Sequence, residues 1–253
     1  MDRVILLLRS LLFQAWFFVT VLVASLAVFL SWPMSHDFRF SIARRWGRAM
    51  LWGGRFFCGL HYVIEGEEHI PSEPSVILIK HSTVFETYAQ LVVFPRQTWV
   101  LKRELTWVPI FGWGLAAMKP IAINRSAGRT AVTQVIEQGR KRLAEGTWVT
   151  VFPEGTRMPS GQTRRYGVSG AALAKEAGCV IVPVAHNAGD FWPRRGLTKR
   201  PGLIRFCIGP PIDAGQRTAK ETNAVVQTWI EGKMREISSG YQEPARTRSD
   251  VEV

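Results

Sequence analysis

The chain is poor in residues that cross-link small folds or hold metal ions. Its three cysteines, Cys58, Cys179 and Cys207, are odd in number, and no two of them have CxxC spacing. This usage excludes a disulfide framework and a cysteine-based zinc site, and it is typical of a reducing, cytosolic setting. We predict no metal site, because the one histidine with an acid at a suggestive spacing supplies too few ligands.

Acidic residues are also scarce. The 253 residues include 20 Asp and Glu against 32 Lys and Arg, which gives a net charge of +12. Such an excess predicts an anionic partner: nucleic acid, an acidic membrane or a phosphorylated substrate. No RRM, KH, zinc-finger or helix-turn-helix signature is present, so nucleic acid is disfavoured. The basic residues lie beside apolar and aromatic stretches, which favours a membrane surface.

Charge is absent from Leu11 to Trp32. A membrane-spanning helix needs about 20 apolar residues. The apolar part of a signal peptide is only about 7–15 residues long and ends at a small-residue cleavage site. Here the apolar run is longer, and the sequence Ser-Trp-Pro-Met at its end is a poor cleavage site. We therefore expect an uncleaved hydrophobic helix that anchors the protein in a membrane.

Arginines are more numerous after this segment than before it: Arg39, Arg44, Arg45, Arg48 and Arg55 follow, and Arg3 and Arg9 precede. If the helix spans, the positive-inside rule places the following domain in the cytoplasm. Residues 38–58 mix arginine with large apolar side chains, which predicts an amphipathic interfacial helix or, alternatively, a helix packed on the catalytic domain. The arginine-rich composition is typical of a GC-rich bacterial genome. The expected location is a bacterial inner membrane, with the catalytic domain on the cytoplasmic face.

From about residue 60, strand-like and helix-like runs alternate. The expected strands are Tyr62–Glu65, Ser75–Lys80, Thr98–Lys102, Pro120–Asn124, Thr147–Phe152, Val180–Ala185 and Ile204–Ile208. The expected helices are Ser82–Val93, Pro109–Met118, Ala127–Ala144, Val168–Glu176 and Ala219–Ile237. This alternation predicts an α/β fold with a mixed, largely buried sheet covered by helices. We divide the chain into a membrane segment with an interfacial helix (1–58), a catalytic domain (59–237) and a polar tail (238–253).

A histidine and an acid stand close together after one expected strand. His81 follows the apolar run Val76–Ile79 after the single residue Lys80, and Glu86 lies five positions later. Sites in α/β folds gather at the carboxyl ends of strands. Residues five apart in a continuous helix lie about 140° from each other, so this pair can meet only if the chain turns between them. We expect His81 in a loop and Glu86 in the first turns of a helix; a structural histidine is the alternative.

The string FPEGTR, Phe152–Arg157, follows another expected strand. Gly155 permits a turn that side chains would block. Backbone N–H groups in such a turn can point at an anion, and the guanidinium of Arg157 matches phosphate oxygens. The string therefore predicts a phosphate site, with an ordinary turn and a surface salt bridge as the alternative.

Four ordered segments resemble the motifs of the PlsC-type glycerolipid acyltransferases, which include the 1-acyl-sn-glycerol-3-phosphate acyltransferases. They are His81-x4-Glu86, Ile121–Arg125, FPEGTR and Val182–Ala185. The resemblance covers about residues 60–212. The first motif of the family usually ends in Asp, whereas Glu-bearing members resemble a bacterial subgroup.

This resemblance implies transfer of a fatty acyl group from acyl-CoA or acyl-ACP to the sn-2 hydroxyl of 1-acylglycerol 3-phosphate. The product is phosphatidic acid for phospholipid synthesis, and no cofactor is needed beyond the acyl co-substrate. The implied partners are a membrane lipid acceptor, the acyl donor and an anionic membrane surface. Two alternatives stay open: the same chemistry on another lyso-lipid, such as a lyso-ornithine lipid, and a non-catalytic membrane-surface binding protein.

The resemblance also implies roles for individual residues. His81 is the expected general base, and Glu86 is expected to fix its tautomer. The acceptor is expected to be held by one set of residues: Lys102, Arg125, Glu154, Gly155, Thr156 and Arg157. Within this set, Glu154 could instead orient Arg157 and close the turn. Apolar residues within 105–118 could line a groove for the acyl chain, and residues 191–195 could dock the membrane or form a packed loop.

Overall fold

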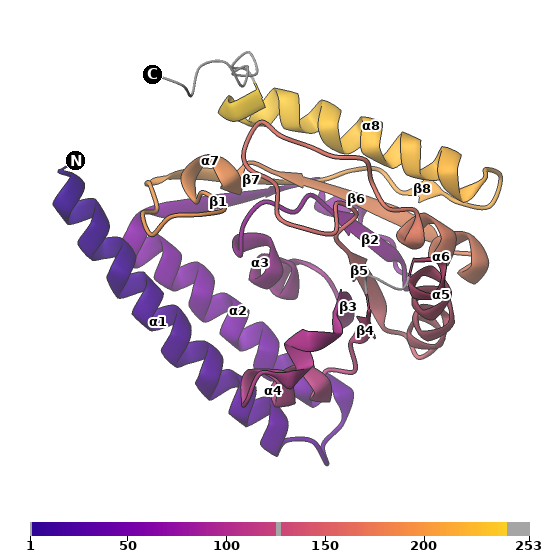
Figure 1. The fold of residues 1–253 in the computed structure, drawn as a ribbon, viewed down its shortest axis with the longest axis horizontal. Helices are drawn as coiled ribbons and strands as arrows, with labels where there is room; N and C mark the ends of the chain where they lie inside the picture. Colours follow the sequence, from indigo (N-terminus) through magenta and orange to yellow (C-terminus); the bar gives the residue numbers. More distant parts are fainter. Residues whose placement is uncertain (1, 125–127, 242–253) are drawn as a thin grey trace.

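The computed structural model describes residues 2–124 and 128–241. Within them, eight strands form one mixed sheet at the centre of the molecule (Figure 1), in the order β1-β7-β6-β2-β5-β3-β4, with β8 beside β6. The strands are β1 (Leu60–Glu65), β2 (Val76–Ile79), β3 (Gln97–Lys102), β4 (Ile121–Ile123), β5 (Trp148–Val151), β6 (Val180–His186), β7 (Gly202–Ile208) and β8 (Ile212–Asp213). All strand pairs are parallel except β6 with β7 and with β8. The predicted mixed sheet is therefore confirmed.

Helices cover both faces of the sheet. Successive residues of a strand point to opposite faces, and the apolar residues of the central strands therefore form two separate cores with these helices. Ile77 and Ile79 of β2 pack into a core with the N-terminal helices, whereas Val76 and Leu78 pack into a second core on the opposite face. The helices are α1 (Arg3–Leu30), α2 (His36–Cys58), α3 (Phe85–Val93), α4 (Phe111–Ala117), α5 (Arg129–Ala144), α6 (Ser169–Ala177), α7 (Ala188–Phe191) and α8 (Ala219–Ile237). Helices α5, α6 and α8 supply the second core.

The two N-terminal helices pack side by side along the first core (Figure 1). Helix α1 is long and apolar enough to cross a membrane. It begins at Arg3, before the expected Leu11, and Arg9 is accommodated by donating a hydrogen bond to the carbonyl of Phe57 at 2.5 Å. Helix α2 buries one face and exposes Trp52 and Phe56 on another. It therefore combines the two alternatives expected for it, packing on the domain and an exposed apolar face.

The sheet topology brings the two sequence motifs together. Strands β2 and β5 are parallel neighbours, so the residues that follow them leave the same edge of the sheet. His81 follows β2, and the FPEGTR segment follows β5. Strands β3 and β6 flank this pair in the same direction, so their carboxyl ends open to the same side.

Candidate active site

His81 and Glu86 form a hydrogen-bonded pair, as the spacing predicts. His81 lies in the loop after β2, and Glu86 is the second residue of α3. The Nδ1 atom of His81 lies 2.8 Å from Oε1 of Glu86. An ionised carboxylate only accepts, so Nδ1 carries the proton and Nε2 keeps a free lone pair. The ring of His81 stacks on Phe152 with a centroid distance of 4.2 Å, and its side chain is 13% exposed.

The carboxylate of Glu86 is fully buried and held by several donors. Its Oε1 accepts from the amides of Ser82 and Thr83 at 2.9 and 3.0 Å, and Thr83 Oγ1 donates to Oε2 at 2.7 Å. Burial alone would raise the pKa of Glu86, but the imidazoles of His186 and His81 and the Thr83 hydrogen bond lower it to about 2. Glu86 therefore stays ionised at neutral pH and can stabilise a protonated His81.

His186 is a member of this site that the sequence interpretation missed. It ends β6, is fully buried, and its Nε2 donates to the carbonyl of Lys80 at 2.9 Å. The same nitrogen lies 3.5 Å from Oε2 of Glu86. Burial lowers the pKa of His186, although the nearby Glu86 carboxylate opposes this shift, and the ring lies beside the Glu86 oxygen that is not bonded to His81. The available signal was its place directly after the Val182–Ala185 motif.

The FPEGTR turn is docked on the backbone of His81. Oε2 of Glu154 accepts from the His81 amide at 3.0 Å, and the Met158 amide donates to the His81 carbonyl at 2.7 Å. Gly155 has φ +67, a conformation that favours glycine, and its amide donates to the Phe152 carbonyl at 2.9 Å. The Gly155 amide therefore closes the turn, and the expected role of this backbone in binding an anion stays a prediction.

Glu154 was expected either to contact an acceptor hydroxyl or to close the turn. Its side chain is fully buried, and Oε1 accepts from the ammonium of Lys80 at 2.7 Å. Lys80 is separated from Glu154 by a long stretch of sequence, so no local pattern indicated this pairing. The buried carboxylate thus holds the turn through Lys80 and the His81 amide, which agrees with the alternative that it closes the turn.

The basic residues of the expected phosphate site divide into three cases. Arg157 is half-buried and lines the same cavity as His81. Lys102 ends β3, is exposed, and its Nζ lies 3.4 Å from Oε1 of Glu104. Arg125 lies outside the described residues. A further guanidinium comes from the loop before β7, where Nη2 of Arg194 donates to the hydroxyl of Thr156 at 3.5 Å.

The loop that carries Arg194 was expected either to dock a membrane or to pack. Trp192 is buried against Phe13 of α1, with ring centroids 5.5 Å apart. Arg194 and Arg195 are exposed. The packed-loop alternative therefore holds for Trp192, and a docking role of the two exposed arginines stays a prediction.

A largely apolar cavity of about 480 Å³ extends from His81 and Arg157. Its walls come from α1, α2, α3, β3 and α4. The segment expected to line an acyl groove contributes Leu105, Phe111, Gly114, Leu115 and Met118. Helices α1 and α4 approach so closely that a Cβ on Gly114 would lie 2.6 Å from the carbonyl oxygen of Ser25. The N-terminal helix is thus part of the cavity wall.

Comparisons with known proteins agree with this geometry. A family model described as "Acyltransferase" matches residues 61–187. The chain is 42% identical to the 1-acyl-sn-glycerol-3-phosphate acyltransferase of Pseudomonas aeruginosa, over 87% of this chain and 86% of that protein. It is 26% identical to the human 1-acyl-sn-glycerol-3-phosphate acyltransferase alpha, over 70% of this chain and 64% of the human protein.

The fold is also similar to a solved structure. The crystal structure of the 1-acyl-sn-glycerophosphate (LPA) acyltransferase PlsC from Thermotoga maritima matches with a TM-score of 0.77 and 20% identity. The match covers 93% of this chain and 97% of that chain. The matched family model and the extent of the Pseudomonas relative show that this chain belongs to the acyltransferase family that includes the 1-acyl-sn-glycerol-3-phosphate acyltransferases.

Proposed function

We propose that this protein transfers a fatty acyl group from an acyl thioester, acyl-CoA or acyl-ACP, to the sn-2 hydroxyl of 1-acylglycerol 3-phosphate. The product is phosphatidic acid for phospholipid synthesis. The observation that carries this proposal is that His81, paired with Glu86, lines one largely apolar cavity together with the cation of Arg157. A base, a phosphate partner and room for a hydrocarbon chain are what this reaction requires. The named activity of the 42% identical relative supports the same acceptor.

The reaction follows from the tautomer of His81. With Nδ1–H donating to Glu86, Nε2 takes the proton of the acceptor hydroxyl as its oxygen attacks the thioester carbonyl carbon. Glu86 stabilises the imidazolium that forms, as the acid does in a serine-protease triad. The carbon–sulfur bond then breaks, and the thiolate takes the proton back from the imidazolium. The attacking hydroxyl belongs to the substrate, so transfer is direct and no acyl-enzyme forms.

Binding of the acceptor phosphate would place its hydroxyl beside Nε2 of His81. Arg157 lies in the same cavity, and Arg194 reaches Thr156 of the same turn. Two guanidinium groups suit a phosphate, because each can donate two parallel hydrogen bonds. Lys102 and Arg125 remain candidates from the sequence pattern. Such positioning supplies a large part of the barrier reduction in a two-substrate reaction.

The apolar N-terminal helix indicates that the protein associates with a membrane. Helix α1 exposes large apolar side chains along one side, while the cavity that it helps to form lies on its other side. A lyso-phospholipid and its acyl chain could then enter from the bilayer. We place the enzyme on the cytoplasmic face of a bacterial inner membrane, where acyl-CoA and acyl-ACP are available.

The test is acyl transfer by detergent-solubilised protein with 1-acylglycerol 3-phosphate and either acyl-CoA or acyl-ACP. His81→Ala should lower kcat by about 10²–10⁴-fold, the usual contribution of a general base. His61→Ala is the matched control, because His61 is exposed on β1. Phosphatidic acid that forms equally well with both variants would refute the assigned base. Transfer only to a phosphate-free lyso-lipid would refute the acceptor.

Arg157 tests the acceptor site separately. Arg157→Ala should raise KM for the acceptor by about 10–100-fold, because it removes charge-assisted hydrogen bonds to phosphate. Arg217→Ala, an exposed arginine before α8, is the control. A variant with unchanged KM for the acceptor would place the phosphate elsewhere.

A further inference from the structure

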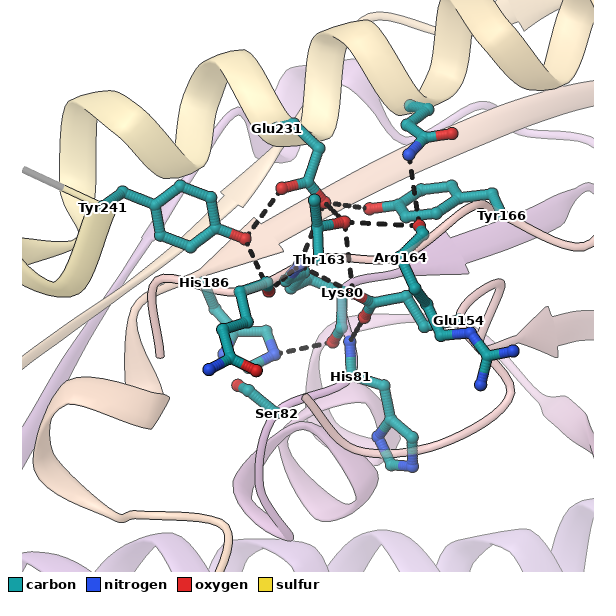
Figure 2. Close-up of polar contacts among 12 residues, drawn as sticks. Lys80, His81, Ser82, Glu154, Thr163, Arg164, Tyr166, His186, Glu231 and Tyr241 are labelled. Carbon is teal, nitrogen blue, oxygen red and sulfur yellow. Dashed lines mark hydrogen bonds and ion pairs between the residues drawn. The ribbon is translucent and has the colours of Figure 1, made fainter. Parts of the chain in front are cut away.

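A buried ionic network lies behind the backbone of His81, on the side away from its imidazole (Figure 2). The Nζ atom of Lys80 lies 2.7 Å from Oε1 of Glu154 and 3.0 Å from Oε1 of Glu231, and it also donates to the carbonyl of Gln162 at 3.1 Å. The side chains of Lys80, Glu154 and Glu231 are 1%, 0% and 7% exposed. Buried charges are tolerated only when they are paired, so these three groups act as one unit.

Glu231 joins this unit from α8, which lies beyond the part of the chain that the family model matches. Its Oε1 accepts from Tyr166 OH at 2.6 Å and from Thr163 Oγ1 at 2.9 Å, and its Oε2 accepts from Tyr241 OH at 2.7 Å. Burial alone would raise the pKa of Glu231, but the Lys80 ammonium and the tyrosine hydrogen bonds lower it. Glu231 is therefore a charged and fixed anchor.

Glu154 connects this anchor to the reacting histidine. One of its oxygens is held by Lys80, and the other accepts from the amide of His81 at 3.0 Å. The carbonyl of His81 is held by the Met158 amide of the same segment at 2.7 Å. A displaced Glu154 would therefore move His81 relative to Glu86. Small misplacements of reacting groups lower catalytic rates steeply.

We propose that Glu231 is a positioning residue for acyl transfer. It orients Lys80, Lys80 fixes Glu154, and Glu154 fixes the backbone of His81 beneath the imidazole. This inference rests on the proposed function for its kinetic consequence, but the mechanical link can be measured without any substrate. It assigns a catalytic consequence to α8, although no residue of that helix lines the cavity.

Glu231→Gln tests the proposal, because it keeps the shape of the side chain and removes its charge. We expect kcat to fall on the order of ten- to hundredfold, with KM for the acceptor unchanged within about twofold. Glu236→Gln is the matched control: Glu236 is exposed on the same helix and pairs with Lys233. A wild-type kcat for Glu231→Gln would overturn the proposal. A rise in KM alone would also overturn it, because that result indicates a role in binding.

Amide hydrogen exchange gives a readout that does not depend on activity. The His81 amide is protected by Glu154, so exchange in the peptide that contains His81 should be faster in Glu231→Gln than in wild type and in Glu236→Gln. If wild type and His81→Ala transfer equally little acyl group, the proposed function fails, and exchange still tests the network. Unchanged exchange at His81 would overturn the link.

A double-mutant cycle separates this pathway from general destabilisation. If Glu231 acts through Lys80, Lys80→Met combined with Glu231→Gln should have a kcat no lower than the worse single variant. Additive losses would contradict the pathway. If Glu231→Gln does not fold, Tyr241→Phe replaces it, because this change keeps the charge of Glu231 and removes only the Tyr241 hydroxyl, which contacts Oε2 of Glu231 and the carbonyl of Gln162. Tyr241→Phe should then show a smaller kcat loss with faster His81 exchange, and wild-type values for both would overturn the proposal.

Discussion

Glu86 is the hydrogen-bond partner of His81, and two substitutions separate the effects of its charge and its length. Glu86→Asp keeps the negative charge that would stabilise the imidazolium, but its side chain is one methylene shorter, so the carboxylate lies farther from His81. Glu86→Gln keeps the length but places an amide against the hydroxyl and amide donors of Thr83. We expect Asp to retain more activity, and Gln to lose up to about 10⁴-fold in kcat. Equal losses in steady-state assays of the two variants would contradict the orienting role.

The buried charge of Glu86 also predicts how stability depends on pH. Its pKa falls from an ordinary 4.5 to about 2 in the fold, which corresponds to roughly 3 kcal/mol. Because the folded pKa is the lower one, this stability is fully present above about pH 4.5 and is lost as the pH falls toward 2. The difference in unfolding free energy between wild type and Glu86→Gln should therefore shrink by about 2 kcal/mol from pH 6 to pH 3. Urea unfolding in mild detergent at the two pH values measures it, and a constant difference would contradict the pKa.

At the residue scale, sequence reasoning found the groups whose partners are close in the chain. Helix geometry predicted that the chain turns between His81 and Glu86. The glycine at position 155 predicted a turn there, and its φ of +67 agrees. The pairing of Glu154 with Lys80 could not be found, because Lys80 comes from a different strand and only the parallel pairing of β2 and β5 brings the two side chains together. His186 was missed for the same reason.

At the scale of elements, α1 has two faces with different functions. It forms part of the cavity wall, and Ala24 lines that wall while Ala27 does not. Ala24→Phe should fill part of the 480 Å³ volume and shift the preferred donor to shorter acyl chains, because the longer chain no longer fits. Ala27→Phe is the matched control, since it adds the same bulk outside the cavity. Competition assays with donors of mixed chain length would show the shift, and an unchanged preference would place the acyl chain elsewhere.

The elements themselves were largely predictable, because long periodic or apolar runs fix them locally. Helix α8 has the expected bounds, and its Thr218–Glu221 capping box explains the sharp start. The short elements β8 and α7 were missed, since two or four residues carry no readable period. The expected start of α5 at Ala127 lies outside the described residues. The strand order could not be read from the sequence, because it depends on contacts between distant segments.

At the scale of the whole molecule, the question is how α1 meets the membrane. Its residues Ser10, Phe13 and Val28 are buried against the rest of the protein, so the helix is attached along most of its length. Near its start, the backbone amide of the buried Lys199 donates to Ser10 Oγ at 2.8 Å, and its Nζ lies 3.2 Å from Gln14 Oε1. If α1 crossed the bilayer, these polar loops would be drawn into the hydrocarbon, where unsatisfied backbone groups are costly.

We therefore expect α1 to lie in one leaflet, with both chain ends on the same side of the membrane. A fluorescent protein that matures only in the cytoplasm, fused to either end, should be bright in both fusions. Alkaline phosphatase, which is active only in the periplasm, should be inactive in both. An inactive fluorescent protein and active phosphatase at the N-terminus alone would show that α1 spans. In that case the packing of α1 against the loop at Lys199 would have to open in the membrane, and the cavity wall that α1 supplies would be lost with it.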